Sequence, residues 1–347
     1  MELTKKYKGA FIAIACAVAF AFAMMGFAPA AHADEAAGPT VTKELQVNAG
    51  SSVTETFNFT ATPTQLNAGT PNATAATSEV PTATIEGIEL TADGATATGT
   101  STIQFGTFPH AGVYAWTIEE TAGTTTGMQY DTQKYTLIAT VENTANGLSD
   151  PTCVIVKGET TTTDKIAAAD KVATAKFTNK YTESASDLTI TKKVDGAQGD
   201  KTKDFEFTVT FTAPSVLPAG MTADQYLAQI TCDKGTISGG KVTFTLKDGE
   251  TATFGNIIAG TTYTVSEADY SGAGYTAKWA AVSNGSNVTE QSNILIGENT
   301  NTGTMTNTKA STVVTGVIMN NLPFVVLLVV ACAGIALYSV ARRKLQR

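Results

Sequence analysis

One ordered set of short motifs occurs twice in this 347-residue chain, and it limits the fold more than any other feature. The first copy consists of VTKEL (41–45), FNF (57–59), FG (105–106), YAWTIEE (114–120) and FTN (177–179). The second copy consists of ITKKV (190–194), FEF (205–207), FG (254–255), YTVSE (263–267) and MTN (305–307). A long repeat that keeps the order of its motifs predicts two domains with one fold.

The segments of the repeat are typical of β-strands. Apolar and polar side chains alternate in runs rich in Val, Ile, Thr, Phe and Tyr, and turn pairs such as Asn146-Gly147 separate the runs. We expect an all-β fold with one domain over 34–182 and another over 186–310. Thr222–Ile230 is the best candidate for a short helix. Residues 60–84, which are rich in Thr, Ala, Pro and Asn, are expected to form a long surface loop.

In each copy, one lysine, one glutamate and one asparagine share a strand face with apolar residues. We call them the first triad (Lys43, Glu120 and Asn179) and the second triad (Lys192, Glu267 and Asn307). Lysine and glutamate are 77 residues apart in the first triad and 75 in the second. Each of these groups is costly to bury alone, so their recurrence indicates a chemical role. The alternatives are an ordinary buried lysine–glutamate pair, or solvent exposure of the strand faces that carry these residues.

Burial can make the three side chains reactive toward one another. An apolar environment lowers the pKa of a lysine and raises the pKa of a glutamic acid. The neutral amine is a nucleophile, and the protonated carboxyl can hydrogen-bond the carboxamide oxygen and relay protons. Attack on the carboxamide carbon would expel ammonia and leave an isopeptide bond, helped by effective molarities on the order of 10⁵ M or more. Glu120 and Glu267 would thus serve a single self-modification in each domain, with no cofactor and no metal.

Both ends of the chain are hydrophobic. Residues 1–33 have the lysines, the apolar run and the A-H-A triplet before Asp34 of a secretory signal peptide, with an uncleaved anchor as the alternative. Residues 321–341 contain an uncharged stretch close to the about 20 residues that a membrane-spanning helix needs. The basic tail at 342–347 is expected to stay in the cytoplasm.

The part of the chain between these ends is acidic. The formal charge of the whole chain is −8, and without the two ends it is about −14 with no arginine. Such a surface should repel nucleic acid and anionic lipid, so no nucleic-acid partner is expected. Cys153 and Cys232 are single cysteines in different domains, so no disulfide framework is expected.

The motifs resemble the Gram-positive sortase-assembled pilins, specifically the streptococcal major (backbone) type. The matching pieces are PTVTKEL, GVYAWTIEE, YDTQKYTL, FTN, DLTITKKV, KDFEF, FTLKDGE, YTVSEADY and MTN, which lie within 39–316. The resemblance implies two tandem immunoglobulin-like β-sandwiches of the collagen-adhesin B type, each with a self-formed isopeptide bond. Carried over to this sequence, the lysine and asparagine of each triad would form the bond and the glutamate would act as the acid.

A segment before the last hydrophobic stretch is similar to a sortase signal, whose usual form is Leu-Pro-x-Thr-Gly. It comprises Thr312, Val313, Val314, Thr315 and Gly316. The Thr-Gly pair matches strictly, and the first valine fits a variant of backbone pilins. The resemblance implies cleavage after Thr315 and transfer to a lysine of the next subunit. Lys171 fits best, with Lys176 and Lys165 as further candidates; permanent membrane anchoring is the alternative.

The resemblance therefore implies a structural subunit of a covalently polymerised pilus, anchored to a Gram-positive cell wall. Its partners would be a pilus sortase, other copies of itself, and tip and base pilins, with a host or neighbouring cell surface as a further candidate. A wall-anchored adhesin or minor pilin that is not polymerised is the alternative. An enzyme is not favoured, because His110 is the only histidine between the two hydrophobic ends and no nucleophile–histidine–acid set accompanies it.

Overall fold

The computed structural model describes residues 38–163, 166–310, 324, 326–335 and 338. The predicted signal peptide, sortase signal and basic tail lie outside these residues. The predicted spanning segment is described only in part, and its described residues are helical. No helix within the described residues is long and apolar enough to cross a membrane.

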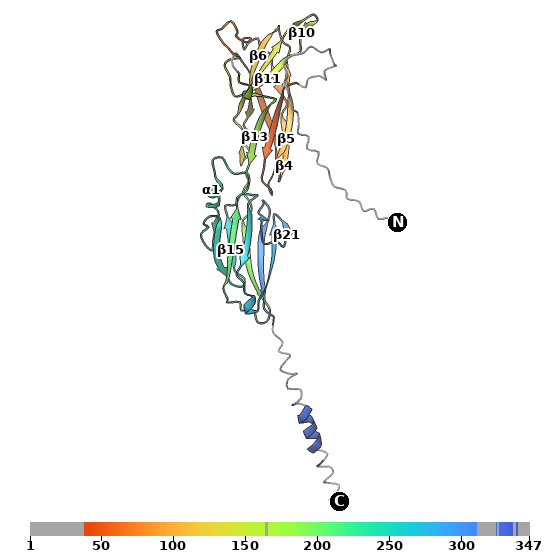
Figure 1. Cartoon of the computed structure of the whole chain (residues 1–347), viewed down its shortest axis with the longest axis vertical. Coiled ribbons are helices and arrows are strands. Elements are labelled where there is room, and N and C mark those ends of the chain that lie inside the picture. Colours follow the sequence, from red (N-terminus) through yellow and green to blue (C-terminus); the bar gives the residue numbers. More distant parts are fainter. Residues whose placement is uncertain (1–37, 164–165, 311–323, 325, 336–337, 339–347) are drawn as a thin grey trace, which may run out of the picture. The chain divides into compact units, whose positions relative to one another are not determined.

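Two sheets and one hydrophobic core form a first β-sandwich between residues 38 and 182 (Figure 1). One sheet has the strand order β3 (Ala83–Ile85), β5 (Ala97–Phe105), β1 (Thr40–Gln46), β13 (Thr174–Tyr181) and β7 (Met128–Gln129). The other has the order β12 (Lys171–Val172), β11 (Thr152–Lys157), β8 (Lys134–Val141), β6 (Gly112–Thr121), β2 (Ser52–Thr64) and β4 (Ile88–Asp93). A small hairpin of β9 (Asn143–Thr144) and β10 (Gly147–Leu148) and a 3₁₀ turn at Ala168–Asp170 complete the sandwich.

The core of the first sandwich follows from strict alternation along its strands. In β1, Val41, Lys43 and Leu45 are buried while their neighbours are partly exposed. The expected surface loop at 60–84 is wrong in part, because β2 continues to Thr64 and Leu66 is fully buried. This leucine packs in a small second cluster with Ala115, Ile138 and Val156, which belong to the six-stranded sheet. Burial of Leu66 against this apolar patch therefore holds that part of the loop against the sheet.

A second β-sandwich lies between residues 184 and 309. One sheet has the order β16 (Thr231–Cys232), β18 (Thr251–Gly255), β14 (Leu188–Asp195), β23 (Asn301–Thr308), β20 (Thr276–Ser283) and β21 (Ser286–Val288). The other has the order β17 (Lys241–Leu246), β15 (Phe205–Thr212), β19 (Thr262–Glu267) and β22 (Ile294–Leu295). The predicted short helix is confirmed as α1 (Ala223–Leu227), which begins with a Thr222–Gln225 capping box. A 3₁₀ turn lies at Ser271–Ala273.

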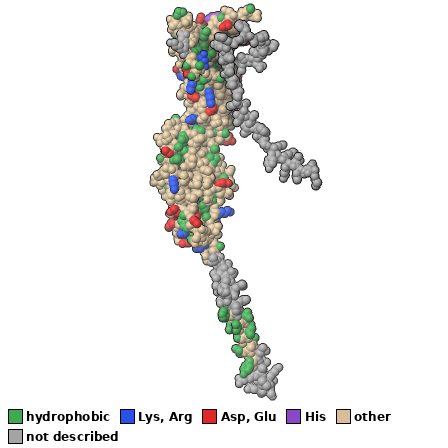
Figure 2. All heavy atoms as spheres, viewed as in Figure 1, with side chains coloured by type: hydrophobic (Ala, Val, Ile, Leu, Met, Phe, Trp, Pro, Cys, Tyr) green, Lys and Arg blue, Asp and Glu red, His purple; other side chains and the backbone are tan. Residues whose placement is uncertain are grey.

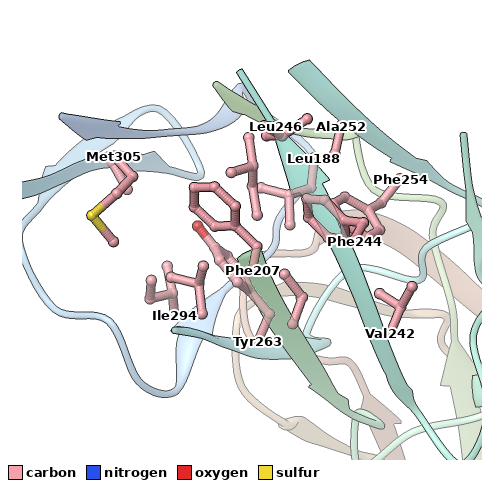
Figure 3. Packing of buried hydrophobic residues seen from close by; sticks show 14 of the residues in the cluster. Leu188, Phe207, Val242, Phe244, Leu246, Ala252, Phe254, Tyr263, Ile294 and Met305 are labelled. Atoms are coloured by element: carbon pink, nitrogen blue, oxygen red, sulfur yellow. The ribbon is translucent and has the colours of Figure 1, made fainter. Parts of the chain in front are cut away.

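Side chains from both sheets fill the second core. Figure 3 shows the rings of Phe207, Phe244 and Phe254 gathered between the strands. The first two rings stack with centroids 5.8 Å apart, and the last two are 5.9 Å apart and tilted. Such inward-facing alternation is the basis of sheet-on-sheet packing.

In both sandwiches the first strand pairs in parallel with the last. β1 pairs with β13, and β14 pairs with β23. A parallel pair between the two ends of a domain places residues more than 100 positions apart next to each other. This pairing positions the candidate site in each sandwich.

Figure 2 shows lysine, aspartate and glutamate side chains of both signs scattered over the visible face. Cys153 and Cys232 are free thiols. His110 is exposed in the loop between β5 and β6, where its backbone oxygen accepts a hydrogen bond from the Tyr114 hydroxyl.

Candidate functional site

The two triads are assembled with the same strand register. In the first sandwich Lys43 lies opposite Phe177, so Asn179 is two residues further along the neighbouring parallel strand. In the second sandwich Lys192 lies opposite Met305, and Asn307 is again two residues further. An offset of two keeps the lysine and the asparagine on the same face of the sheet.

Each glutamate comes from the opposite sheet. Glu120 pairs with Phe59 across β6 and β2, and Glu267 pairs with Phe207 across β19 and β15. The glutamate is thus opposite the second phenylalanine of the F-x-F motif in both copies. Each carboxyl projects across the sandwich toward the lysine and the asparagine.

In the first triad, one carboxyl group bridges the other two side chains. Lys43 Nζ lies 2.7 Å from Glu120 Oε2, and the side chains of both residues are fully buried. Asn179 Nδ2 donates a 2.5 Å hydrogen bond to Glu120 Oε1. Each carboxyl oxygen therefore serves one partner, the amine on one side and the carboxamide nitrogen on the other.

The second triad repeats this bridge. Lys192 Nζ lies 2.8 Å from Glu267 Oε1, with side-chain exposures of 0% and 3%. Asn307 Nδ2 donates a 2.7 Å hydrogen bond to Glu267 Oε2. The structure therefore brings together all six residues of the two predicted triads.

One contact differs from the sequence-based expectation. The carboxyl group was expected to hydrogen-bond the carboxamide oxygen, but in both triads it contacts the nitrogen. In the first triad the oxygen already has a partner, because Asp131 donates its backbone N–H to Asn179 Oδ1 over 2.8 Å. Sequence reasoning missed Asp131, since a backbone donor from a loop leaves no residue-type signal.

Burial sets the electrostatics of both triads. Loss of hydration lowers the pKa of Lys43 and raises the pKa of Glu120, although their contact opposes both shifts. Burial also lowers the pKa of Lys192. In the first triad these pKa shifts favour the neutral amine and the neutral acid, and in the second the shift of Lys192 favours the neutral amine.

An aromatic ring covers each lysine amine. Lys43 Nζ lies 4.5 Å from the Phe57 ring centroid, and Lys192 Nζ lies 4.1 Å from that of Phe205. These phenylalanines begin the F-x-F motif of each copy, so the repeat contained them, although sequence reasoning gave them no role. A ring face attracts a cation, but it also keeps water from the amine.

The arrangement can support amide exchange without any cofactor. Lysine Nζ would attack asparagine Cγ, the Nζ–Cγ bond would form and the Cγ–Nδ2 bond would break. One carboxyl oxygen is placed to accept a proton from Nζ, and the other to deliver a proton to the departing nitrogen. The products are an amide link and ammonia, and the carboxyl group returns to its starting protonation state.

The candidate linking lysines lie in different surroundings. Lys171 is exposed on the short edge strand β12. Lys176 forms a 2.7 Å ion pair with Glu44 on the neighbouring strand β1. Lys165 lies outside the described residues. In the described part of the chain, no group of three or more His, Cys, Asp or Glu residues could hold a metal ion.

Comparison with known proteins identifies the family. Residues 39–182 match a Spy0128-like isopeptide containing domain, and residues 186–309 match a domain of unknown function (DUF7601). The pilin of Streptococcus pyogenes serotype M1 is 31% identical over 258 residues, which is 68% of this chain and 69% of that protein. The chain belongs to the pilin family. The resemblance drawn from the sequence motifs is thereby confirmed.

This pilin is a structural subunit of a pilus with an isopeptide domain, and it is not a turnover enzyme. Among solved structures, the major pilin from Streptococcus pyogenes is similar at 24% identity with a TM-score of 0.35, covering 79% of this chain and 98% of that one. The pilus-presented adhesin Spy0125 (Cpa) is similar at 24% identity with a TM-score of 0.27, covering 51% of this chain and 37% of that one. The family assignment rests on the sequence match.

Proposed function

We propose that this pilin is a shaft subunit in which each sandwich forms its own Lys–Asn isopeptide bond. The bonds would join Lys43 to Asn179 and Lys192 to Asn307, with Glu120 and Glu267 as the respective proton relays. One observation carries the proposal: two buried triads share the same register and the same bridging carboxyl, although their glutamate–asparagine spacings are 59 and 40 residues. Chance burial of charged groups would not reproduce this geometry twice.

The positions of the bonds suit a chain under tension. Each lysine is on the first strand of its domain and each asparagine on the last, and the two strands are neighbours. A force entering β1 would cross directly to β13 through the bond, without loading the other strands of the sandwich. Because the bonds close loops of 137 and 116 residues, the loop-entropy model gives each a stabilisation of about 5 kcal/mol.

Polymerisation is the finer part of the proposal. Residues 1–33 would direct export, and 321–341 would hold the precursor in the membrane. A pilus sortase would cleave between Thr315 and Gly316 and pass Thr315 to a lysine of another copy. Lys171 is the preferred acceptor because it is exposed on an edge strand. Tip and base pilins are the further partners we propose, and the product would be attached to the Gram-positive cell wall.

Co-expression with a pilus sortase in a Gram-positive host tests this function. A ladder of high-molecular-weight species that survives boiling in SDS is expected, and Thr315→Ala should abolish it. A single band in the presence of active sortase would contradict polymerisation, and would favour an adhesin or minor pilin attached to the wall on its own.

A further inference from the structure

The two triads differ at the carboxamide oxygen of the asparagine. In the first sandwich, Asn179 Oδ1 accepts the backbone N–H of Asp131 over 2.8 Å. In the second, Asn307 Oδ1 is buried and has no hydrogen-bond partner within the described residues. A buried polar atom usually has a partner, so this difference needs an explanation.

The side chain of Asp131 fixes its own backbone N–H beside the triad. Its Oδ2 accepts a 2.7 Å hydrogen bond from the N–H of Thr178, the residue before Asn179 on β13. Its Oδ1 accepts a 2.8 Å hydrogen bond from the N–H of Gln133. These two contacts tie the loop to the strand that carries the asparagine. The donor is therefore in place before any reaction begins.

The attack of an amine on a carboxamide places negative charge on this oxygen. When lysine Nζ bonds to Cγ, the electrons of the C=O bond move to Oδ1, and they return when the Cγ–Nδ2 bond breaks and ammonia leaves. We propose that the Asp131 N–H is an oxyanion donor for bond formation in the first sandwich, and that the second sandwich takes this hydrogen bond from solvent. The inference rests on the proposed isopeptide function and adds a catalytic group to it.

The surroundings of the second triad fit a donor from solvent. Glu267 and Asn307 line a surface pocket of about 380 Å³ together with Tyr270, Tyr275 and Gln291. A pocket of this size admits several water molecules, and a water can bridge an unpaired polar atom. A water must be ordered for each reaction, whereas the Asp131 N–H is held in advance. The first bond should therefore form faster than the second.

The test measures both bonds in the same full-length chain. The protein is made by cell-free translation, and samples are quenched at intervals in acidic denaturant and digested. Mass spectrometry then quantifies the 43–179 and 192–307 crosslinked peptides separately. We expect the first bond to form at least ~10-fold faster, since removal of a preorganised oxyanion donor typically slows a reaction by ~10²–10³-fold.

Asp131→Pro removes the donor N–H together with the two side-chain loop contacts, and Asp131→Asn retains both the N–H and an acceptor oxygen. Asp131→Pro removes the N–H and should slow the first bond by ~10²-fold without changing the rate of the second. Asp131→Asn keeps the N–H and an acceptor oxygen and should restore most of the rate. Circular dichroism of Asp131→Pro in an Asn179→Ala background, where no first bond can form, reports whether the loop change alters folding.

The outcomes distinguish this inference from the proposed function. Equal rates for the two bonds in the unmodified chain overturn the inference and leave the isopeptide function intact, whatever the variants do. An unchanged first bond in folded Asp131→Pro overturns it as well. Absence of both crosslinked peptides overturns the isopeptide function itself.

Discussion

Lys43 and Asn179 lie on neighbouring parallel strands with a register offset of two residues, and both contact the carboxyl group of Glu120. The second sandwich has the same offset between Lys192 and Asn307. A slip of one residue between these strands would turn one of the two side chains away from the core. The pairing of the first and last strands therefore determines whether the reaction can occur.

Loss of the first bond should destabilise the first sandwich. Asn179→Ala removes the acceptor while the Lys43–Glu120 contact remains, so the main loss is the closed loop. The free energy of unfolding should fall by about 5 kcal/mol, and the melting temperature by roughly 10–20 °C. Scanning calorimetry measures both. Asn143→Ala, at an exposed position in the same sandwich, is the control; equal melting temperatures for the two variants would argue against the bond.

Mechanical extension should depend on each bond separately. When the unmodified chain is pulled from its two ends, the segments between the bonded residues cannot lengthen. Asn179→Ala should release 137 residues, or about 450 Å of extended chain. Asn307→Ala should release 116 residues, or about 400 Å. Single-molecule force spectroscopy resolves both steps, and steps of these lengths in the unmodified chain would disprove the load-bearing role.

The rate of bond formation should be bell-shaped in pH. Burial lowers the pKa of Lys43 from 10.5 and raises that of Glu120 from 4.5. The reactive pair shares one titratable proton. A fall in pH adds a second proton and removes the free amine, and a rise in pH removes the acid proton that the leaving nitrogen needs. The acid limb, which the amine sets, should therefore lie below pH 10.5, and the alkaline limb, which the carboxyl group sets, should lie above pH 4.5.

Folding jumps of newly translated chain into buffers of different pH would measure this profile, with the crosslinked peptide quantified after each jump. A rate that rises continuously through pH 10.5, the ordinary pKa of lysine, would show that an exposed amine reacts and that the carboxyl group takes no part.

Polymerisation should depend on Lys171 more than on Lys176. Lys171→Ala should remove the SDS-resistant ladder, because its amine is the proposed acceptor. Lys176→Ala is the matched control, since that lysine is paired with Glu44 at 2.7 Å. Lys171→Arg keeps the charge but cannot form the amide, so it should fail as well. A ladder that persists in both Lys171 variants and is lost in Lys176→Ala would reverse the assignment.

Alternation along the strands was enough to predict which side chains face the core. The positions of Lys43 between Val41 and Leu45, and of Glu120 after Ile118, follow from the period of two. Repetition of the pattern then made the two triads recognisable. These predictions depend only on the succession of residues within each short motif, which can be read directly from the sequence.

Contacts between distant segments could not be predicted in this way. The register of β1 against β13 depends on packing across the 127 residues between the two strands (47–173). The N–H of Asp131 belongs to a loop whose path no strand pattern specifies. Leu66 was expected on the surface because its neighbours are polar, yet it is buried in the small second cluster with Ala115, Ile138 and Val156. In each case the deciding partner is remote in the sequence.

The intact mass of residues 34–315 tests the central claim most directly. The account predicts a mass lower than that of the unmodified polypeptide by two molecules of ammonia, with one molecule regained in Glu120→Ala, one in Glu267→Ala and both in the double variant. A full mass for the folded, unsubstituted protein would contradict the account.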